Sequence, residues 1–222
     1  TAHAIANQLS GQLGAFSTTL MKALNPVIHK SEGASSRKLM QKAAMMGSKV
    51  SFFLMMAFHI PMLIEMPYVL NLWLKNVPEY TIIFCQLLLI RNLIEQLFIP
   101  LNTAISAVGN IKSYQIRVSL ISIFPLIITY ILFKFGYPAY AIYIVFIISS
   151  ILLAILTLYY AKKHCQLSLA EFFNNVIARC TAAFILVFLI SLIPHFFAEP
   201  SFMRFLGVTL VSFISFLIIV FF

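Results

Sequence analysis

Residues 80–117 read YTIIFCQLLLIRNLIEQLFIPLNTAISAVGNIKSYQIR and predict a long membrane helix followed by a short polar turn. Near the middle, apolar residues on both sides enclose several polar ones, where lipid would make each charge cost roughly 2.5 kcal/mol or more. Placed on a helix, the polar residues share one sector of about 140°: Arg91, Asn92, Glu95, Gln96, Asn102 and Ser106. Pro100 is expected to kink the later turns. We therefore expect this sector to face protein or water.

Three roles are open for the charged pair in this helix. Because Arg91 and Glu95 lie four residues apart, they can form a structural ion pair that holds neighbouring helices together. Arg91 can instead offer positive charge to an anionic substrate inside a cavity, with Glu95 orienting its side chain. In the third role, Glu95 binds a coupling ion.

Composition places the chain in the membrane. It has 222 residues, of which 62% are hydrophobic and 9% are charged, and its mean hydropathy is +0.99. No globule of this size has enough interior to bury that much apolar surface, so a soluble domain is excluded. The net charge of +9 comes from scattered Lys and Arg, which indicates topology signals rather than nucleic-acid binding. The three cysteines lack the spacing of metal ligands, so no metal site is predicted.

The first predicted helix, residues 4–25, is amphipathic rather than uniformly apolar. One half of the helix carries Asn7, Gln8, Gly11, Gln12, Gly14, Thr18, Thr19, Lys22 and Asn25. The other half carries Leu9, Leu13, Phe16, Leu20 and Leu24, which we expect to face lipid. The polar half can line a cavity, pack through Ser10, Gly11 and Gly14, or lie on the membrane surface. Pro26 is expected to end the helix.

The rest of the chain alternates apolar spans with short connections. The predicted spans are residues 43–64, the long helix from residue 80, and residues 118–133, 139–161, 176–193 and 205–222. Residues 66–79 are expected to form an interfacial elbow, residues 134–138 a tight turn and residues 167–175 a short amphipathic segment. The predicted fold is an all-α, polytopic transmembrane helix bundle with about seven spans.

The distribution of basic residues predicts the orientation of these spans. One set of connections carries ten Lys or Arg, namely residues 30, 37, 38, 42, 49, 112, 117, 162, 163 and 179. The opposite set carries Lys75, Lys134 and Arg204. Because cytoplasmic loops are enriched in Lys and Arg, the first set is predicted to lie inside. The amino end of the chain is then outside and the carboxyl end inside.

Two stretches resemble a known family. AIANQLSGQLGAFSTTLMKALNPVIHKSEG and LNLWLKNVPEYTIIFCQLLLIRNLIEQLFIPLNTAISAVGNIKSYQI are similar to the carboxyl-terminal half of bacterial oligosaccharide and polysaccharide flippases. These flippases, including those of O-antigen type, belong to the multidrug/oligosaccharidyl-lipid/polysaccharide exporter superfamily. The resemblance covers about residues 2–175 and implies part of a MATE-like transporter with two lobes. Residues 1–161 would form one lobe without its first helix, residues 162–175 a cytoplasmic amphipathic linker, and residues 176–222 two additional helices. We therefore expect a fragment of a longer protein.

The resemblance implies a transporter rather than an enzyme. Its substrate would be an undecaprenyl-pyrophosphate-linked oligosaccharide, moved by alternating access across the bacterial inner membrane for polysaccharide or lipopolysaccharide biosynthesis. Expected partners are this lipid-linked oligosaccharide, membrane lipids and the missing amino-terminal lobe, with no nucleic acid. No cofactor is expected, and Na⁺ and H⁺ both remain open as the coupling ion.

A diphosphate and its sugars must avoid hydrocarbon, so the path requires a polar cavity with cationic groups. Helix geometry, not the family motif, suggests the cavity candidates: Asn7, Gln8, Gln12, Thr19, Lys22, Asn25, Arg91, Asn92, Glu95 and Asn102.

Three rival functions are weaker. A cation-coupled multidrug exporter would need acidic residues in the cavity, and only Glu95 is predicted to be deep in a chain without Asp. A membrane-embedded glycan-processing enzyme would need an acid/base constellation on sizeable loops, whereas the predicted outer loops are short. A purely structural scaffold would not require so wide a polar face on residues 4–25.

Overall fold

The computed structural model describes residues 2–34 and 36–221, and within them every regular element is a helix. In chain order the elements are α1 (Ala2–Gly33), α2 (Arg37–Trp73), α3 (Thr81–Gln96), α4 (Ile99–Ala107), α5 (Lys112–Lys134), α6 (Ala141–Cys165), α7 (Leu169–Phe172), the π-helix η1 (Phe173–Ile177), α8 (Ala178–Phe197) and α9 (Phe202–Phe221).

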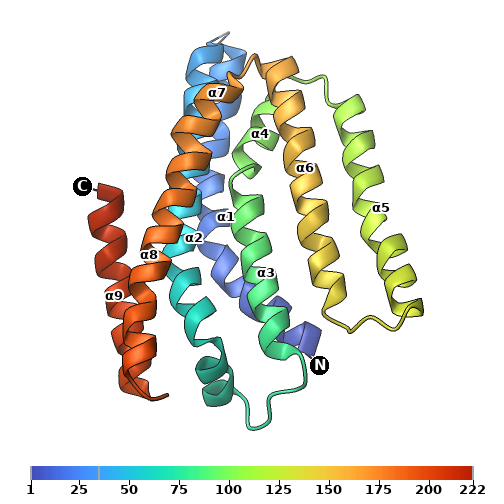
Figure 1. Ribbon diagram of the computed structural model, residues 1–222. Helices are drawn as coiled ribbons and strands as arrows, with labels where there is room; N and C mark the ends of the chain where they lie inside the picture. The colour runs from blue at the N-terminus through green and yellow to red at the C-terminus, as the bar shows by residue number, and fades with distance from the viewer. Residues whose placement is uncertain (1, 35, 222) are drawn as a thin grey trace.

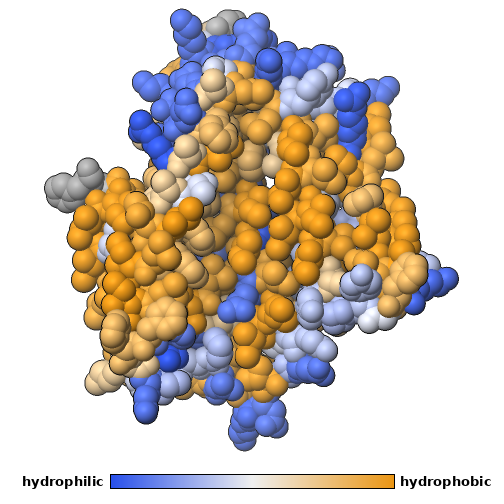
Figure 2. Space-filling view, viewed as in Figure 1, coloured by the Kyte–Doolittle hydropathy of each residue, from blue (hydrophilic) through white to orange (hydrophobic). Residues whose placement is uncertain are grey.

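The helices run up and down in a single bundle (Figure 1). Helix α2 is central, because it contacts α1, α3, α4, α8 and α9. Helix α5 stands at one edge of the bundle and packs on α6, while α9 stands at the other edge and packs on α8 and α2 (Figure 1). The middle of the face in Figure 2 is hydrophobic, with hydrophilic residues gathered at the two ends. This distribution is that of a bundle whose sides meet lipid.

Six helical stretches in the described part of the chain are long and apolar enough to cross a bilayer. They are α2, α3 with α4, α5, α6, α7 with α8, and α9. Helix α1 has 32 residues and is therefore about 48 Å long, enough to cross as well, although its composition is more polar. The prediction of an all-α polytopic bundle with about seven spans is confirmed.

The prediction that Pro26 ends the first helix is wrong. Helix α1 continues through Pro26 to Gly33. Pro26 is exposed, so the backbone carbonyl that loses its hydrogen bond is not trapped in the interior. Beyond the proline, Ile28 is fully buried and Ser31 bonds back to the carbonyl of Val27, and both contacts favour continued helix.

The predicted elbow at residues 66–79 is also wrong in its first half. Helix α2 runs on to Trp73 and bends at Glu65, whose φ of −99° and ψ of 18° are not helical. Pro67 lacks the N–H that would bond the carbonyl of Leu63, and the side-chain amide of Gln86 on α3 donates to that carbonyl instead, at 3.1 Å. A neighbouring helix therefore satisfies the backbone group that the proline frees, as membrane helices require.

Pro100 interrupts the long helix as predicted. Helix α3 ends at Gln96 and α4 begins at Ile99, so the expected kink is a full break of the helix.

In α5, Pro125 frees the carbonyl of Ile121, and the hydroxyl of Ser149 on α6 lies 3.4 Å from it. The predicted polar turn after the long helix and the predicted turn at residues 134–138 form around Gly109 and Gly136, whose positive φ angles of 88° and 78° favour glycine.

The predicted linker of residues 162–175 is distributed over several elements. Residues 162–165 form the last turn of α6, and Gln166 follows in a left-handed conformation. The segment from Leu169 then runs through α7 and η1 into α8. The hydroxyl of Ser168 caps this helix by accepting a hydrogen bond from the backbone N–H of Glu171.

Gly47 marks a close approach between helices in the bundle core. A Cβ atom at this position of α2 would lie 3.1 Å from Cδ1 of Leu24 on α1 and 3.3 Å from Cβ of Pro100 on α4. Three helices therefore meet where α2 has no side chain, an arrangement typical of packed membrane helices.

Replacing Gly47 by leucine should lower the thermal stability of the purified protein, because overpacking a core typically costs about 1–3 kcal/mol. Gly11→Leu is the matched control, since nothing in the structure lies within 4 Å of a Cβ at that position. Thermal unfolding followed by size-exclusion chromatography measures both variants. Equal melting temperatures for the two variants would contradict the close approach at Gly47.

Candidate functional site

Helix α1 turns its polar half outward and its apolar half into the bundle. Leu13, Met21 and Ile28 are buried, and Leu9 packs at the edge of the same core. The expectation that the apolar half faces lipid is therefore wrong for Leu9 and Leu13, because α2, α3 and α4 cover this side of α1. Nothing is described for the side chain of Phe16, which belonged to the same expectation.

The polar half of α1 is an open surface in this chain. Gln8, Gln12 and Lys22 are exposed and make no hydrogen bond to any described residue. Thr18 and Thr19 are exposed too, and both hydroxyls donate to the carbonyl of Ala15 in their own helix.

Two contacts fix the amino-terminal turn beside this surface. Asn7 is exposed and its side-chain amide lies 2.8 Å from Nε2 of His3. The other ring nitrogen of His3, Nδ1, lies 2.6 Å from the hydroxyl of Tyr143 on α6. The contact with Tyr143 ties the start of α1 to α6, and the contact with Asn7 holds the His3 ring from within α1.

Close packing through small residues does not explain the polar half of α1. A Cβ atom at Gly11 or Gly14 would meet nothing within 4 Å, so no described helix packs closely against either glycine. Of the three small residues considered, only Ser10 makes a contact between helices, because its hydroxyl accepts a hydrogen bond from Asn92 at 2.7 Å. The packing hypothesis is therefore wrong for the two glycines.

Arg91 and Glu95 form the ion pair that their spacing predicts. Nε of Arg91 lies 2.8 Å from Oε1 of Glu95, and the two side chains are 30% and 35% exposed. The hydroxyl of Ser150 on α6 accepts from Arg91 Nε at 3.1 Å and lies 2.7 Å from Glu95 Oε1, so the pair links α3 to α6.

The outer end of the Arg91 side chain remains available. The Arg91 guanidinium carbon lies 5.0 Å from the centre of the Phe146 ring, a cation–π contact. Its two terminal nitrogens make no hydrogen bond to any residue that the structure describes. The guanidinium is therefore positioned by Nε and Phe146 while keeping N–H groups free for another acceptor.

The remaining predicted residues lie at contacts between helices. The amide of Asn92 joins α3 to Ser10 of α1, and the side-chain oxygen of Asn25 accepts from Thr103 of α4 at 3.2 Å. The side-chain oxygen of Asn102 accepts from Tyr114 of α5 and from Thr157 of α6, the latter at 3.0 Å. These three asparagines hold the polar sector of α3 and α4 against α1, α5 and α6.

Neither of the two described cavities is lined by a predicted site residue. The larger, about 1000 Å³, lies between α2, η1, α8 and α9. The smaller, about 500 Å³, is an apolar hollow between α2, α3 and α8. The candidate residues instead divide into an open surface on α1 and a set of contacts between helices.

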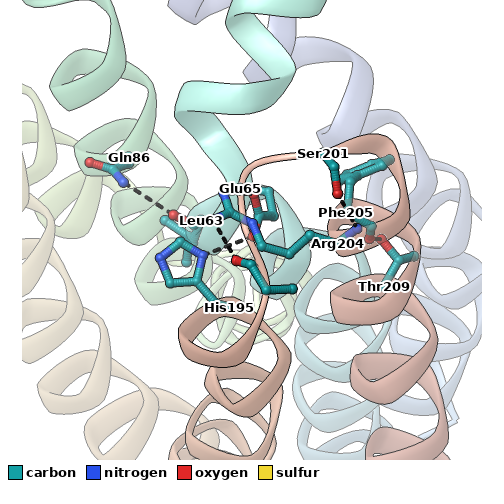
Figure 3. A network of polar contacts seen from close by, with 9 residues as sticks. Leu63, Glu65, Gln86, His195, Ser201, Arg204, Phe205 and Thr209 are labelled. Carbon is teal, nitrogen blue, oxygen red and sulfur yellow. Dashed lines mark hydrogen bonds and ion pairs between the residues drawn. The ribbon is translucent and has the colours of Figure 1, made fainter.

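A buried carboxylate that the sequence analysis did not single out binds the last two helices to α2. Glu65 is fully buried at the bend of α2, with Oε1 lying 2.8 Å from Nδ1 of His195 on α8 and Oε2 lying 2.8 Å from Nη2 of Arg204 on α9 (Figure 3). Arg204 also donates to the carbonyl of Ala198, which fixes the turn between α8 and α9. Glu65 is therefore the more buried of the two carboxylates, because the Glu95 side chain is one-third exposed.

The signal for this cluster was present in the sequence. Glu65 stands alone between two prolines in an otherwise apolar run, IPMLIEMPYVL, where an unpaired charge would be costly. The nearest Lys residues in sequence are Lys75 and Lys49, whereas the true partners lie at least 130 positions away. The cluster of Glu65, His195 and Arg204 does not have the composition of a metal site. Among the described residues, no group of three or more His, Cys, Asp or Glu side chains is placed to hold a metal ion.

Comparisons with protein-family models, with curated proteins and with solved structures find no match to this chain.

Glu65→Ala should lower thermal stability strongly, because it leaves Arg204, only 10% exposed, without its partner. Breaking a buried ion pair in this way costs about 3–5 kcal/mol. The double variant Glu65→Ala/Arg204→Ala should lose less than the sum of the single variants, since neither charge is then left unpaired. Melting temperatures of the purified variants give the comparison.

Lys163→Ala is the control for loss of a charge. Lys163 is exposed and forms no ion pair with any described residue. Surface substitutions of this kind typically change stability by about 0.5 kcal/mol or less, so this variant should melt close to the parent protein. A strictly additive double variant would mean that Glu65 and Arg204 do not depend on each other.

Proposed function

We propose that this chain forms one lobe of a membrane transporter that moves a lipid-linked, anionic oligosaccharide across the bilayer. The substrate class is an undecaprenyl-pyrophosphate glycan, and the biological role is surface polysaccharide biosynthesis in the bacterial inner membrane. This function combines the resemblance of residues 2–175 to oligosaccharide flippases with the placement of polar groups in the bundle.

The single observation that carries the proposal is the open polar half of α1. Gln8, Gln12 and Lys22 lie on a helix within a bundle whose other outward surfaces are largely apolar, as on α5 and α9. Amides and an ammonium facing hydrocarbon would lose their hydrogen bonds to water. Water or a polar partner is therefore the surrounding that suits this surface.

Arg91 supports an anionic substrate. Its terminal N–H groups have no partner among the described residues, and a guanidinium matches phosphate oxygens in charge and in fork geometry. Its pairing with Glu95 and Ser150 holds the side chain in place before the substrate arrives, which reduces the entropy lost on binding.

The open polar surface supports a transporter made of two lobes. A path for sugars and diphosphate must be enclosed by polar walls, and the described helices supply one such wall on α1. In the proposed mechanism a second lobe faces this wall, and rocking of one lobe against the other opens the path to each side of the membrane in turn. The isoprenoid tail stays in lipid throughout, because hydrocarbon is already its preferred surrounding.

The ion pairs of Glu65 and Glu95 disfavour a cation-coupled multidrug exporter. Glu65 is shared by His195 and Arg204, and Glu95 is paired with Arg91. Neither carboxylate therefore presents an uncompensated negative charge to a cationic drug. The orientation of the proposed transporter, with Lys42 and Lys162 on the cytoplasmic side, follows from the basic residues of the connections.

Cysteines placed at Gln8, Gln12 and Thr19 should react readily with a water-soluble maleimide in intact membranes, because the polar half of α1 faces water. Two controls separate water from lipid and from protein: Leu126→Cys on α5, which is exposed to the surroundings of the bundle, and Leu13→Cys, which is buried. The native Cys85, Cys165 and Cys180 are buried and should give little background. Labelling at Gln8 and Gln12 no greater than at Leu126 would place this face in lipid and remove the cavity wall.

Arg91→Ala should reduce surface glycan about tenfold or more in a bacterial strain that lacks its own oligosaccharide flippase and is complemented with the intact protein. The reduction reflects the loss of a charge-assisted hydrogen bond, worth about 1.5–3 kcal/mol. Arg91→Lys keeps the charge and should be milder, and Lys134→Ala removes an exposed cation at the far end of α5 as the control. Normal surface glycan in Arg91→Ala cells with normal protein levels would exclude Arg91 from the path.

A further inference from the structure

The larger cavity is a groove on the opposite edge of the bundle from α5, bounded by α2, η1, α8 and α9. Its volume of about 1000 Å³ is at the upper end for pockets that hold small molecules. The transport proposal does not use this groove, and none of the candidate substrate residues lines it.

The wall of the groove that α2 forms changes from cationic to apolar along the helix. The lining residues Lys42, Met46, Lys49 and Phe53 are spaced three or four apart, so they form one continuous stripe. The stripe is cationic at its first two turns and wholly apolar after Lys49. Over the 13 residues from Lys42 to Leu54 this wall extends about 18 Å along the helix axis.

The opposite wall, formed by η1 and α8, also changes from polar to apolar in the same direction. Its stripe begins with Asn175 and Arg179 and continues with Ala182, Ala183 and Leu186. Helix α9 supplies only apolar lining, including Phe216 and Val220. The groove is therefore polar and cationic at the basic end of the bundle and apolar toward its middle.

The charge at the polar end favours an anion. Three cations, Lys42, Lys49 and Arg179, line the groove together with one carboxylate, Glu171. None of the four forms an ion pair with another described residue. All three cationic side chains therefore remain free to meet a negatively charged group from outside the chain.

We propose that this groove binds one anionic phospholipid, with its phosphate headgroup among Lys42, Lys49 and Arg179 and an acyl chain along the apolar floor. A phospholipid has the same sequence of properties as the groove, a charged head followed by hydrocarbon. Partly exposed apolar residues on the floor, such as Met46 and Leu186, would then be covered by the acyl chain. Juxtamembrane cations attract anionic headgroups in the same way on other membrane proteins.

The headgroup site is tested by native mass spectrometry of the intact protein in detergent, titrated with phosphatidylglycerol or with phosphatidylcholine. The parent protein should bind one phosphatidylglycerol more tightly than phosphatidylcholine. The triple variant Lys42→Gln/Lys49→Gln/Arg179→Gln should weaken phosphatidylglycerol binding roughly a hundredfold, as expected for the loss of three charges near a headgroup.

The matched control removes three exposed cations from the same end of the bundle but outside the groove, Lys112→Gln/Lys162→Gln/Lys163→Gln. This variant should bind phosphatidylglycerol like the parent protein. An equal loss in both triple variants would reduce the effect to net charge and overturn the site. A dimer of the chain with no bound lipid would overturn it as well, because a second copy would then occupy the groove.

The acyl chain is tested separately by fluorescence. The only tryptophan of the sequence, Trp73, is replaced by phenylalanine, and a new one is introduced at Leu186 in the groove. A few equivalents of phosphatidylglycerol with brominated chains should quench Leu186→Trp strongly and Leu126→Trp on α5 weakly, because only the first lies on the groove floor. Equal quenching at both positions would mean that the acyl chain does not enter the groove.

Discussion

A bilayer offers no hydrogen bonds, and this constraint shapes the contacts of many polar groups in the bundle. The prolines illustrate it most directly. Pro67 and Pro125 each free a backbone carbonyl inside a membrane-spanning helix, and in each case a side chain from a neighbouring helix approaches the freed oxygen. Helix breaks and bends are thereby tolerated without leaving a carbonyl in hydrocarbon, and the same contacts fix which helices are neighbours.

The same constraint separates several of the polar side chains into two groups. Glu65, Asn25 and Asn102 are bonded to partners on other helices, so their polarity is satisfied within the chain. Gln8, Gln12 and Lys22 are not bonded to any described residue and lie on the surface of α1. The first group holds the bundle together, and the second supplies the argument for a wet transport path. Arg91 belongs to both groups, because Nε is bonded while its terminal nitrogens are free.

The two carboxyl-terminal helices have a distinct relation to the rest of the bundle. The cluster of Glu65, His195 and Arg204 attaches α8 and α9 at one end of α2, where the ion pairs are largely buried. At the other end of the same helices the larger groove separates α2 from α9. Helices α8 and α9 are therefore attached to α2 by ion pairs at one end and border an amphipathic groove at the other. This arrangement suits helices that contact both protein and lipid.

The sequence by itself determined the membrane class, the approximate number of spans, the turns at Gly109 and Gly136 and the presence of a kink at Pro100, because these depend on local hydropathy and backbone geometry. Periodicity also separated the two halves of α1, and spacing gave the pair of Arg91 and Glu95. Only the tertiary structure decided that the apolar half of α1 packs inward, that α1 continues past Pro26, and that Glu65 meets residues from α8 and α9. Those outcomes depend on which helices become neighbours, and partners at least 130 positions apart leave no trace in local sequence pattern.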